Sequence, residues 1–299
     1  MHRFRTPALA LLATATLFAQ PATAQESATL KKIKDSGTIA LGHRESSIPF
    51  SYYDDKQQVV GYSHELMLKV VDAVKAELKL PNLAVKLTPV TSQNRIPLVQ
   101  NGTVDIECGS TTHNSERARQ VAFSNTIFII GTRLMTKKDS GIKDFADLAG
   151  KNLVTTAGTT SERLVRKMND DKKLGMKIIS AKDHGEAFLT LETGRAVAFM
   201  MDDALLYGEM AKARKPADWT VVGTPQSFEA YGCMMRKDDP GFKKLVDGAL
   251  AKAMTSGEAE AIYKKWFTQP IPPKGLNLNF PLSDAMQKLY KAPNDKAFE

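Results

Sequence analysis

The chain reads Asp-Ile-Glu-Cys-Gly-Ser-Thr-Thr-His-Asn-Ser-Glu-Arg from Asp105 to Arg117. An apolar strand is predicted over 103–108, and hydroxyl side chains follow it directly after Gly109. Ser115 is predicted to be the N-cap of a helix, with Arg117 in its first turn. A helix N-terminus offers unpaired N–H groups with partial positive charge, and a guanidinium matches two carboxylate oxygens. The segment therefore predicts a site for the head group of a free amino acid.

The first 24 residues have the pattern of a signal peptide. Arg3 and Arg5 are basic, 8–18 is an apolar run too short to span a membrane, and Ala22-Thr-Ala24 fits a signal peptidase site. We therefore expect cleavage near Ala24 and a periplasmic mature protein. An amphipathic N-terminal helix is the alternative, but Pro21 and the small residues fit cleavage better.

The formal net charge is +8 for the 299 residues and falls to about +6 without the signal peptide. A basic balance can indicate a nucleic-acid or membrane partner. Here the lysines are interleaved with acids, as in 170–173, which is typical of a solvated surface. We expect no nucleic-acid partner and a monomer.

The chain has two cysteines, Cys108 and Cys233, in separate apolar, strand-like stretches. In an exported protein such a pair is compatible with one disulfide, but also with two neighbouring buried thiols. His and Cys residues nowhere have metal-ligand spacing, so the sequence predicts no metal site and no cofactor.

Buried strands bounded by glycine alternate with amphipathic helices, which predicts an α/β fold. The stretches 96–105 and 188–197 share one predicted pattern, in which a helix ends at a glycine and is followed by a buried strand with a polar end. An apolar strand over 127–135 is predicted to leave a first lobe, and one over 231–236 to return to it. We therefore predict a signal peptide over 1–24, a first lobe from 25–132 and 227–299, and a second lobe from 133–226. Two chain crossings indicate a hinged clamshell.

Polar side chains gather at the ends of these predicted strands, where open α/β sheets bind ligands. The candidate ligand-binding residues are Arg44, Ser92, Arg95, Ser110, Thr112, Arg117, Thr159, Thr160, His184 and Asp202.

Three arginines and one histidine in this set are opposed by a single acid, Asp202. A zwitterion needs one cation and one acid, which Arg117 and Asp202 would supply. Arg44, Arg95 and His184 then require a second carboxylate, and this predicts glutamate or aspartate as the ligand. For any one of these residues the alternatives are a surface ion pair or a helix cap.

Several motifs resemble the periplasmic solute-binding proteins for polar amino acids, the receptor subunits of ABC importers, and within that family the members for glutamate and aspartate. The motifs are His43-Arg-Glu-Ser-Ser47, Thr91-Ser-Gln-Asn-Arg95, Glu107-Cys-Gly-Ser-Thr-Thr112, Lys182-Asp-His-Gly185, Phe199-Met-Met-Asp-Asp203 and Tyr231-Gly-Cys233. The resemblance covers nearly all of the predicted mature chain. It implies the type II periplasmic binding protein fold, in which each lobe is a mixed β-sheet flanked by helices and a hinge of two strands leaves a ligand cleft between the lobes.

The resemblance also implies individual roles. It implies that Arg117, helped by Thr160, holds the α-carboxylate, and that Ser110, Thr112 and Asp202 hold the ammonium group. It implies that the side-chain carboxylate is held by Arg44, Ser92, Arg95 and His184. Thr159 is assigned less firmly, because either threonine of the pair could face the cleft.

We therefore expect a receptor, not an enzyme, that captures L-glutamate or L-aspartate by hinge closure and delivers it to the permease subunits of an ABC importer. The alternative is a hydro-lyase-type enzyme on the same fold acting on a small carboxylic acid. Such an enzyme needs a carboxylate general acid, for which Glu45 and Glu107 are the nearby candidates. A receptor's ligand-sensing domain is a third reading, disfavoured because the sequence shows no membrane anchor.

Overall fold

The structure is a computed structural model that describes residues 27–297, apart from the side chain of Leu276. The predicted signal peptide and its cleavage site therefore lie outside the described residues. No helix within residues 27–297 is long and apolar enough to cross a membrane.

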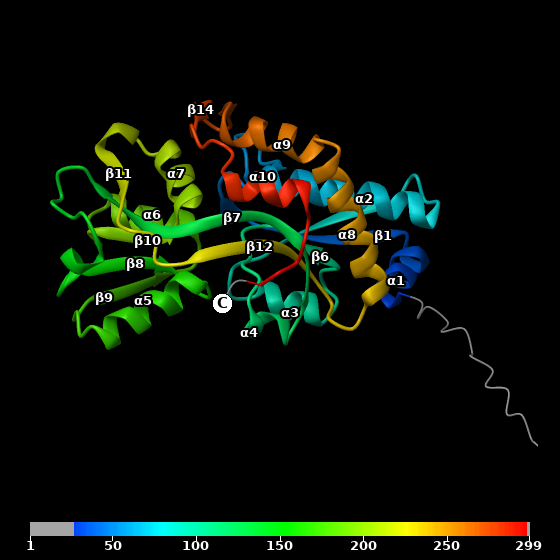
Figure 1. Cartoon of the computed structure of the whole chain (residues 1–299), viewed down its shortest axis with the longest axis horizontal. Coiled ribbons are helices and arrows are strands. Elements are labelled where there is room, and N and C mark those ends of the chain that lie inside the picture. The colour runs from blue at the N-terminus through cyan, green and yellow to red at the C-terminus, as the bar shows by residue number, and fades with distance from the viewer. Residues whose placement is uncertain (1–26, 298–299) are drawn as a thin grey trace, which may run out of the picture.

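Two lobes lie side by side and are joined by the long strands β7 (Ala122–Lys137) and β12 (Phe228–Met235) (Figure 1). The main elements of the first lobe are α1 (Ala28–Ser36), β1 (Thr38–His43), α2 (Tyr62–Leu78), β5 (Ala84–Pro89), α3 (Arg95–Gln100), β6 (Ile106–Glu107), α4 (Ser115–Ala118), α8 (Pro240–Thr255), α9 (Glu258–Phe267) and α10 (Asp284–Lys291). Those of the second lobe are β8 (Asn152–Thr156), α5 (Thr160–Asp171), β9 (Lys177–Ala181), α6 (His184–Glu192), β10 (Ala198–Asp202), α7 (Asp203–Lys212) and β11 (Trp219–Val222).

Both lobes contain a mixed sheet, and β7 belongs to both. In the first lobe the strand order is β5-β1-β6-β12-β7, with β1 parallel to β5 and β6 and with β12 antiparallel to β6 and β7. In the second lobe β7 is antiparallel to β10 and β11, while β10, β8 and β9 are parallel. The α/β, two-lobe prediction is confirmed. The strand predicted over 127–135 is shorter than the observed β7. The strand predicted over 231–236 is shifted relative to the observed β12.

The first lobe is packed around aromatic side chains from distant parts of the chain. Phe128 of β7 stacks on Phe267 of α9 with ring centroids 4.9 Å apart. Phe50 contacts Phe128 edge to face, with ring centroids 4.8 Å apart. Aromatic pairs of this kind contribute roughly 0.5–1.5 kcal/mol beyond their buried area. This core fixes β7 against the helices of the first lobe, so that the start of the hinge is rigid.

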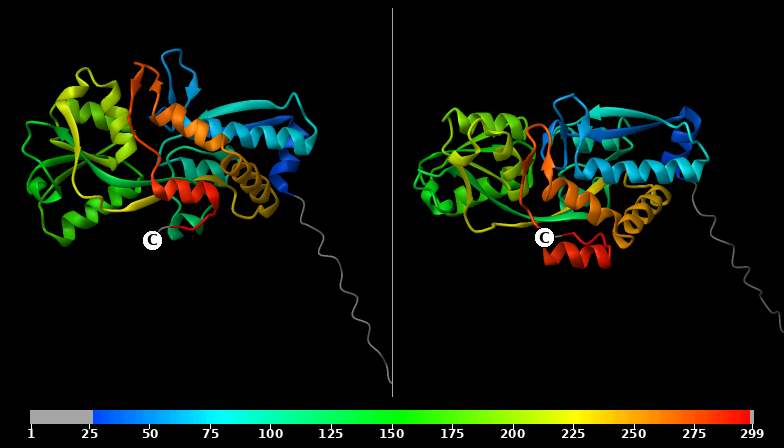
Figure 2. Two further views of the ribbon diagram at one scale, coloured as in Figure 1. Left: turned by 45° about the horizontal axis from the view of Figure 1, so that its top comes forward. Right: turned by 90° about the horizontal axis from the view of Figure 1, so that it is seen from above.

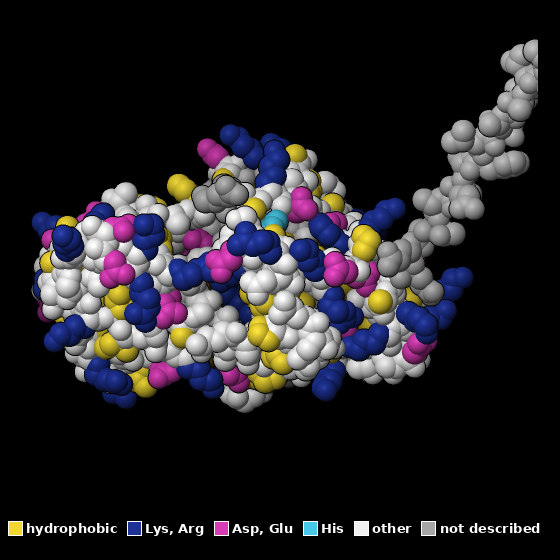
Figure 3. Space-filling view, turned by 90° about the horizontal axis from the view of Figure 1, so that it is seen from below, with side chains coloured by type: hydrophobic (Ala, Val, Ile, Leu, Met, Phe, Trp, Pro, Cys, Tyr) yellow, Lys and Arg dark blue, Asp and Glu magenta, His cyan; other side chains and the backbone are white. Residues whose placement is uncertain are grey.

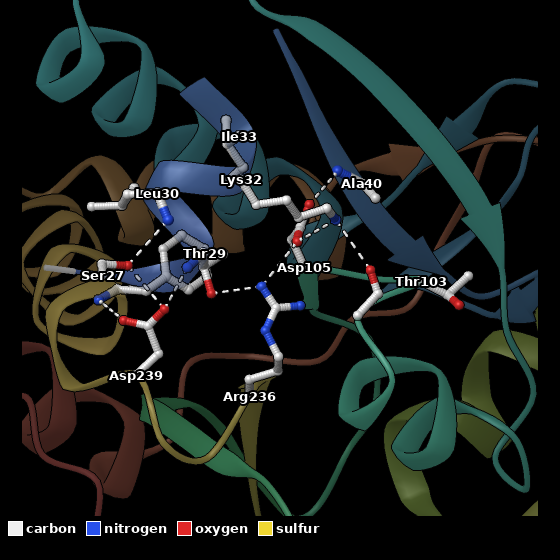
Figure 4. Close-up of polar contacts among 12 residues, drawn as sticks. Ser27, Thr29, Leu30, Lys32, Ile33, Ala40, Thr103, Asp105, Arg236 and Asp239 are labelled. Carbon is white, nitrogen blue, oxygen red and sulfur yellow. Dashed lines mark hydrogen bonds and ion pairs between the residues drawn. The ribbon is translucent and has the colours of Figure 1, made fainter. Parts of the chain in front are cut away.

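The first described residues are tied to the returning end of β12 by a polar network (Figure 4). Asp239, the N-cap of α8, accepts hydrogen bonds from Ser27 Oγ at 2.9 Å and from Thr29 N at 2.7 Å. Arg236 donates to Thr29 Oγ1 at 2.7 Å and lies 3.4 Å from the buried carboxylate of Asp105. These contacts join α1 to the ends of β6 and β12.

Residues beyond α9 form a small hairpin, β13 (Pro270–Ile271) and β14 (Leu276–Asn277), and then α10. The hairpin reaches toward α7 of the second lobe in Figure 1. Helix α10 lies against the outer side of β7 (Figure 2), where Ile129 N donates to Met286 Sδ at 3.2 Å. A short three-stranded sheet of β2 (Ser46–Ser47), β3 (Ser51–Tyr53) and β4 (Val59–Val60) follows β1. Single 3-10 turns occur at Phe145–Leu148 and Pro216–Asp218.

Lysine and arginine side chains are spread over both lobes on the face shown in Figure 3, with acidic side chains between them. This distribution agrees with the interpretation of the basic charge as a solvated surface.

Candidate functional site

The candidate residues lie where strand ends of the two lobes face each other. Nine of the ten are buried, with exposures of 1–7%, and Thr160 is partly exposed. For charged side chains such burial is unusual unless partners compensate it. The structure thus brings residues from six separate segments into one polar interior.

Arg44 and Arg95 converge on Ser110. Arg44 Nη1 donates to Ser110 Oγ over 3.4 Å, and Arg95 Nη1 donates to the Ser110 carbonyl over 3.0 Å. Burial and the charge of Arg95 together lower the pKa of Arg44 to about 10. Two like charges so close together make this part of the cleft strongly attractive to an anion.

Three donor atoms around these guanidiniums have no hydrogen-bond partner among the described residues. They are Ser92 Oγ, Arg95 Nε and His184 Nε2. Buried polar atoms are nearly always paired in folded proteins, so an unpartnered group inside a cleft indicates where a ligand binds.

His184 is the first residue of α6, directly after the N-cap Asp183. Its Nδ1 lies 2.8 Å from Thr156 Oγ1. Burial holds the pKa of His184 well below its usual range, and the charges of Arg44 and Arg95 act in the same direction. The lowered pKa favours the neutral imidazole over the cation that the sequence-based charge count assumed.

Arg117 connects the two lobes. Its Nη1 donates to the Thr112 carbonyl at 3.0 Å and its Nη2 to the Gly158 carbonyl of the second lobe at 3.2 Å. Burial lowers the pKa of Arg117 to about 9, with Arg95 and Arg163 adding to the effect.

The helix that carries Arg117 begins one residue earlier than predicted. Asn114, not Ser115, is the N-cap, because its backbone is extended and its Oδ1 accepts from Arg117 N at 2.9 Å. Helix α4 is a single turn, so a head group here depends on side chains more than on helix N–H groups.

Asp202 ends β10 and is surrounded by hydroxyl groups. Thr132 Oγ1 donates to its Oδ1 at 3.0 Å, and the Tyr231 hydroxyl donates to its Oδ2. Burial and the nearby charge of Glu229 together raise the pKa of Asp202 to about 7.

The two threonines at the start of α5 have different tasks. Thr159 Oγ1 accepts from Glu162 N at 3.0 Å and donates to the Thr156 carbonyl at 2.7 Å, so Thr159 caps the helix. Thr160 Oγ1 donates to Glu229 Oε2 at 3.0 Å.

Two acids of the site are absent from the predicted binding set. Glu229 and Glu107 are both buried, and Glu107 Oε2 accepts from Thr111 Oγ1 at 2.8 Å. Glu107 was considered in the sequence only as a general acid, and Glu229 carries no local signal. The predicted balance of four cations against one acid is therefore wrong, because two more carboxylates oppose the guanidiniums.

Contacts cross the cleft on both sides of the candidate residues. Ser46 Oγ of the first lobe donates to Asp183 Oδ1 at 3.2 Å and accepts from Gly185 N at 3.3 Å. On the other side, Arg163 forms an ion pair with Glu116. A cavity of about 700 Å³ borders the hinge and is lined by residues that include Thr112, Thr160 and Glu229. The two lobes thus enclose the polar interior.

Cys108 and Cys233 form a disulfide with an S–S distance of 2.08 Å. This settles the alternatives left open by the sequence. The bond joins the segment that precedes Gly109 to β12, so it holds the site loop on the returning hinge strand. Among residues 27–297, His, Cys, Asp and Glu side chains form no group of three placed to hold a metal ion.

Comparisons with known proteins agree with this geometry. The sequence model of the bacterial extracellular solute-binding proteins, family 3, matches residues 39–269. The "L-glutamate/L-aspartate-binding protein" of Pseudomonas aeruginosa is 67% identical, over 95% of this chain and 95% of that protein. The "Glutamate/aspartate import solute-binding protein" of Escherichia coli is 62% identical, over 99% of each. A crystal structure of a mutant of ArgBP from T. maritima superposes with a TM-score of 0.71 at 26% identity, over 80% of this chain and 98% of that one.

Proposed function

The chain belongs to family 3 of the bacterial extracellular solute-binding proteins, and from this premise we propose that it captures L-glutamate or L-aspartate between its lobes and passes it to the permease of an ABC importer. It is a solute-binding protein and not an enzyme. The hydro-lyase alternative is not favoured, because relatives 62–67% identical along nearly the whole chain have binding and import names.

One observation carries the choice of ligand: buried polar atoms that can donate a hydrogen bond have no partner in the part of the chain that the structure describes. Ser92 Oγ, Arg95 Nε and His184 Nε2 all lack partners in the described chain. If Thr156 donates to His184 Nδ1, then Nε2 of the neutral ring carries its proton and is a donor. Three such donors suit a carboxylate, which accepts at both oxygens, better than the amide NH2 group of glutamine, although Glu107 Oε1 is an unpartnered acceptor beside Arg44.

For the amino-acid head group we propose the roles that the family resemblance implies. Arg117 and Thr160 hold the α-carboxylate, while Ser110, Thr112 and Asp202 hold the ammonium group. Thr159 supports these residues as the cap of α5, since its hydroxyl is already used twice within the helix turn.

The net charge of the site supports an acidic amino acid by a smaller margin than the sequence indicated. Arg44, Arg95 and Arg117 are opposed by Glu107 and Glu229, and by Asp202 with its pKa raised to about 7. One net positive charge remains while Asp202 is protonated, and this attracts a ligand with one net negative charge.

We further propose that residues 1–24 are removed on export and that the monomer works in the periplasm. The first lobe would then consist of 25–132 and 227–299, and the second of 133–226. The position of β7 and β12 between the two bodies in Figure 1 supports these boundaries.

Isothermal titration calorimetry tests the ligand, after carried-over amino acid has been removed by unfolding and refolding. L-Glutamate and L-aspartate should bind tightly, and L-glutamine about ten- to a hundredfold more weakly, because one charge-assisted hydrogen bond contributes roughly 1.5–3 kcal/mol. His184→Ala should weaken the acidic ligands chiefly, and Arg117→Ala should weaken all of them. Tight binding of glutamine without glutamate would refute the proposal, and mass-detected conversion of bound glutamate would restore the enzyme reading.

A further inference from the structure

Glu107 is a buried carboxylate at the end of β6. It is packed directly beneath the part of the cleft formed by Arg44 and Arg95, which we call the distal subsite. The two glycines around it leave no room for a side chain. A Cβ atom at Gly109 would lie 2.5 Å from Glu107 Oε1 and 2.8 Å from Arg44 Cγ. At Gly42 it would lie 3.0 Å from Glu107 Cγ. Because Gly109 has no side chain, the carboxylate of Glu107 and the side chain of Arg44 can both pack against its Cα.

The same carboxylate is connected to Arg95 through one hydroxyl group. Arg95 Nη1 donates to Thr111 Oγ1 at 2.5 Å, and Thr111 Oγ1 donates to Glu107 Oε2 at 2.8 Å. The charge of Glu107 opposes the burial that lowers the pKa of both Arg44 and Arg95. Glu107 thus acts on the pair of guanidiniums without occupying the face that they present to the cleft.

We propose that Glu107 determines the charge of side chain that the distal subsite accepts. It cancels one of the two guanidinium charges, so that the subsite fits a group with one negative charge and discriminates against a group of the same shape with two. The ligands that Glu107 disfavours are amino acids with a phosphate or phosphonate in place of the side-chain carboxylate. This inference rests on the proposed function, because it takes the distal subsite to be the one that holds the side chain.

The effect of Glu107 has a simple electrostatic form. Its repulsion acts on each negative charge of the ligand side chain, so neutralising it favours a dianion about twice as much as a monoanion in free energy. Any loss of guanidinium positioning would weaken the dianion more than the monoanion, which is the opposite direction. A rise in the affinity ratio therefore reports the charge effect of Glu107.

Three amino acids with side chains of equal length provide the test. L-Glutamate ends in a planar monoanion, L-homocysteate in a tetrahedral monoanion, and O-phospho-L-serine in a tetrahedral group that carries two charges at pH 8, since the second phosphate pKa is about 6. Dissociation constants are measured at pH 8 by calorimetric competition for the wild-type protein, Glu107→Gln and the control Glu77→Gln. The control makes the same charge change at an exposed position on α2.

In Glu107→Gln, the affinity of phosphoserine relative to homocysteate should rise at least tenfold, while glutamate relative to homocysteate stays within about threefold of wild type. In Glu77→Gln both ratios should stay unchanged. A phosphoserine-to-homocysteate ratio within threefold of wild type would overturn the inference.

A second neutral variant, Glu107→Met, is measured if Glu107→Gln does not fold, and the same tenfold rise is expected. Failure of both variants to fold would make Glu107 a structural residue and would also overturn the inference. Failure of the proposed function is a separate result, because wild-type protein would then not bind glutamate at all.

Discussion

Asp202 is a buried carboxyl group whose charge depends on the group beside it. Burial and Glu229 raise its pKa to about 7, so the closed cleft without a ligand favours the protonated form at slightly acidic pH. An ammonium group in contact with Asp202 favours the carboxylate instead. Ligand binding below about pH 7 must therefore release a proton.

We predict that the affinity for glutamate decreases as the pH falls below about 7 and is constant above it. The raised pKa of Asp202 gives this sign, and the loss approaches tenfold per pH unit in the steepest part. The pKa of His184 is shifted the other way, well below its usual range by burial, so the raised pKa of Asp202 sets the sign of the effect. Calorimetry at pH 5.5 and pH 8, in buffers of different ionisation enthalpy, measures both affinity and proton release. Tighter binding at pH 5.5 than at pH 8 would contradict the role of Asp202.

The two neglected acids show what local sequence can and cannot predict. Arg44, Arg95 and His184 can be predicted because each lies within a few residues of the carboxyl end of a strand, and that rule needs no knowledge of the partner strand. Glu229 pairs with Thr160, which is 69 positions away, and Glu107 acts through a hydroxyl of its own loop. Their roles depend on tertiary packing, which residue spacing does not reveal.

The start of α5 shows how one helix terminus divides structural and binding roles between adjacent residues. Thr159 uses its hydroxyl for the helix cap, whereas Thr160 directs its hydroxyl to Glu229 at the cleft. Sequence alone could not separate them, because both are threonines at the same turn. The same limit explains the cap of α4, where Asn114 and Ser115 are both good N-cap residues.

Thr159→Ala and Thr160→Val should therefore affect different measurements. Loss of the cap in Thr159→Ala should lower the free energy of unfolding by about 1 kcal/mol and change glutamate affinity little. Thr160→Val should keep the stability but weaken glutamate binding about tenfold, through the lost hydroxyl. Both variants are measured by urea unfolding and by calorimetry, and each variant is the control for the other. Equal effects of both variants on affinity would show that the division is wrong.

Hinge strand β7 also shows why element boundaries were imperfectly predicted. The sequence predicts a strand over only 127–135 of its 16 residues, because the polar Ser124 and Asn125 stand before that apolar stretch. In the structure Asn125 N donates to Asp247 Oδ1 of α8 at 2.7 Å. Ser124 Oγ accepts from Cys233 N of β12 at 2.9 Å. The polar residues are thus satisfied by neighbouring elements and the strand continues.

The disulfide should stabilise the whole molecule, because it closes a long loop in the unfolded chain. Cys108 and Cys233 are separated by 125 positions, and bonds across long loops contribute about 2–4 kcal/mol. We predict that the double variant Cys108→Ser/Cys233→Ser loses this amount in urea unfolding without ligand. Dithiothreitol should shift the wild-type midpoint in the same direction and leave the variant unaffected. An unchanged wild-type midpoint on reduction would show that the bond does not contribute.

The hairpin after α9 is the part of the first lobe that holds the second lobe from outside the cleft. Tyr52 anchors it, since its hydroxyl donates to the Pro272 carbonyl at 2.8 Å. Lys274 Nζ then donates to the carbonyls of Lys212 and Ala213, at 2.7 and 2.8 Å. These carbonyls form the C-terminal end of α7, where a cation is favoured by roughly 0.3–1 kcal/mol.

We expect this contact to break when the lobes separate, so its loss should speed opening and leave closing unaffected. We predict that Lys274→Met increases the dissociation rate of glutamate about two- to fivefold with an unchanged association rate. Stopped-flow tryptophan fluorescence can follow both rates, since Trp219 lies in the second lobe and Trp266 in the first. Lys252→Met is the matched control, because Lys252 is an exposed lysine on α8 of the first lobe. A dissociation rate equal in both variants would show that closure is held by the cleft residues alone, and that the hairpin rests on α7 without contributing to retention of the ligand.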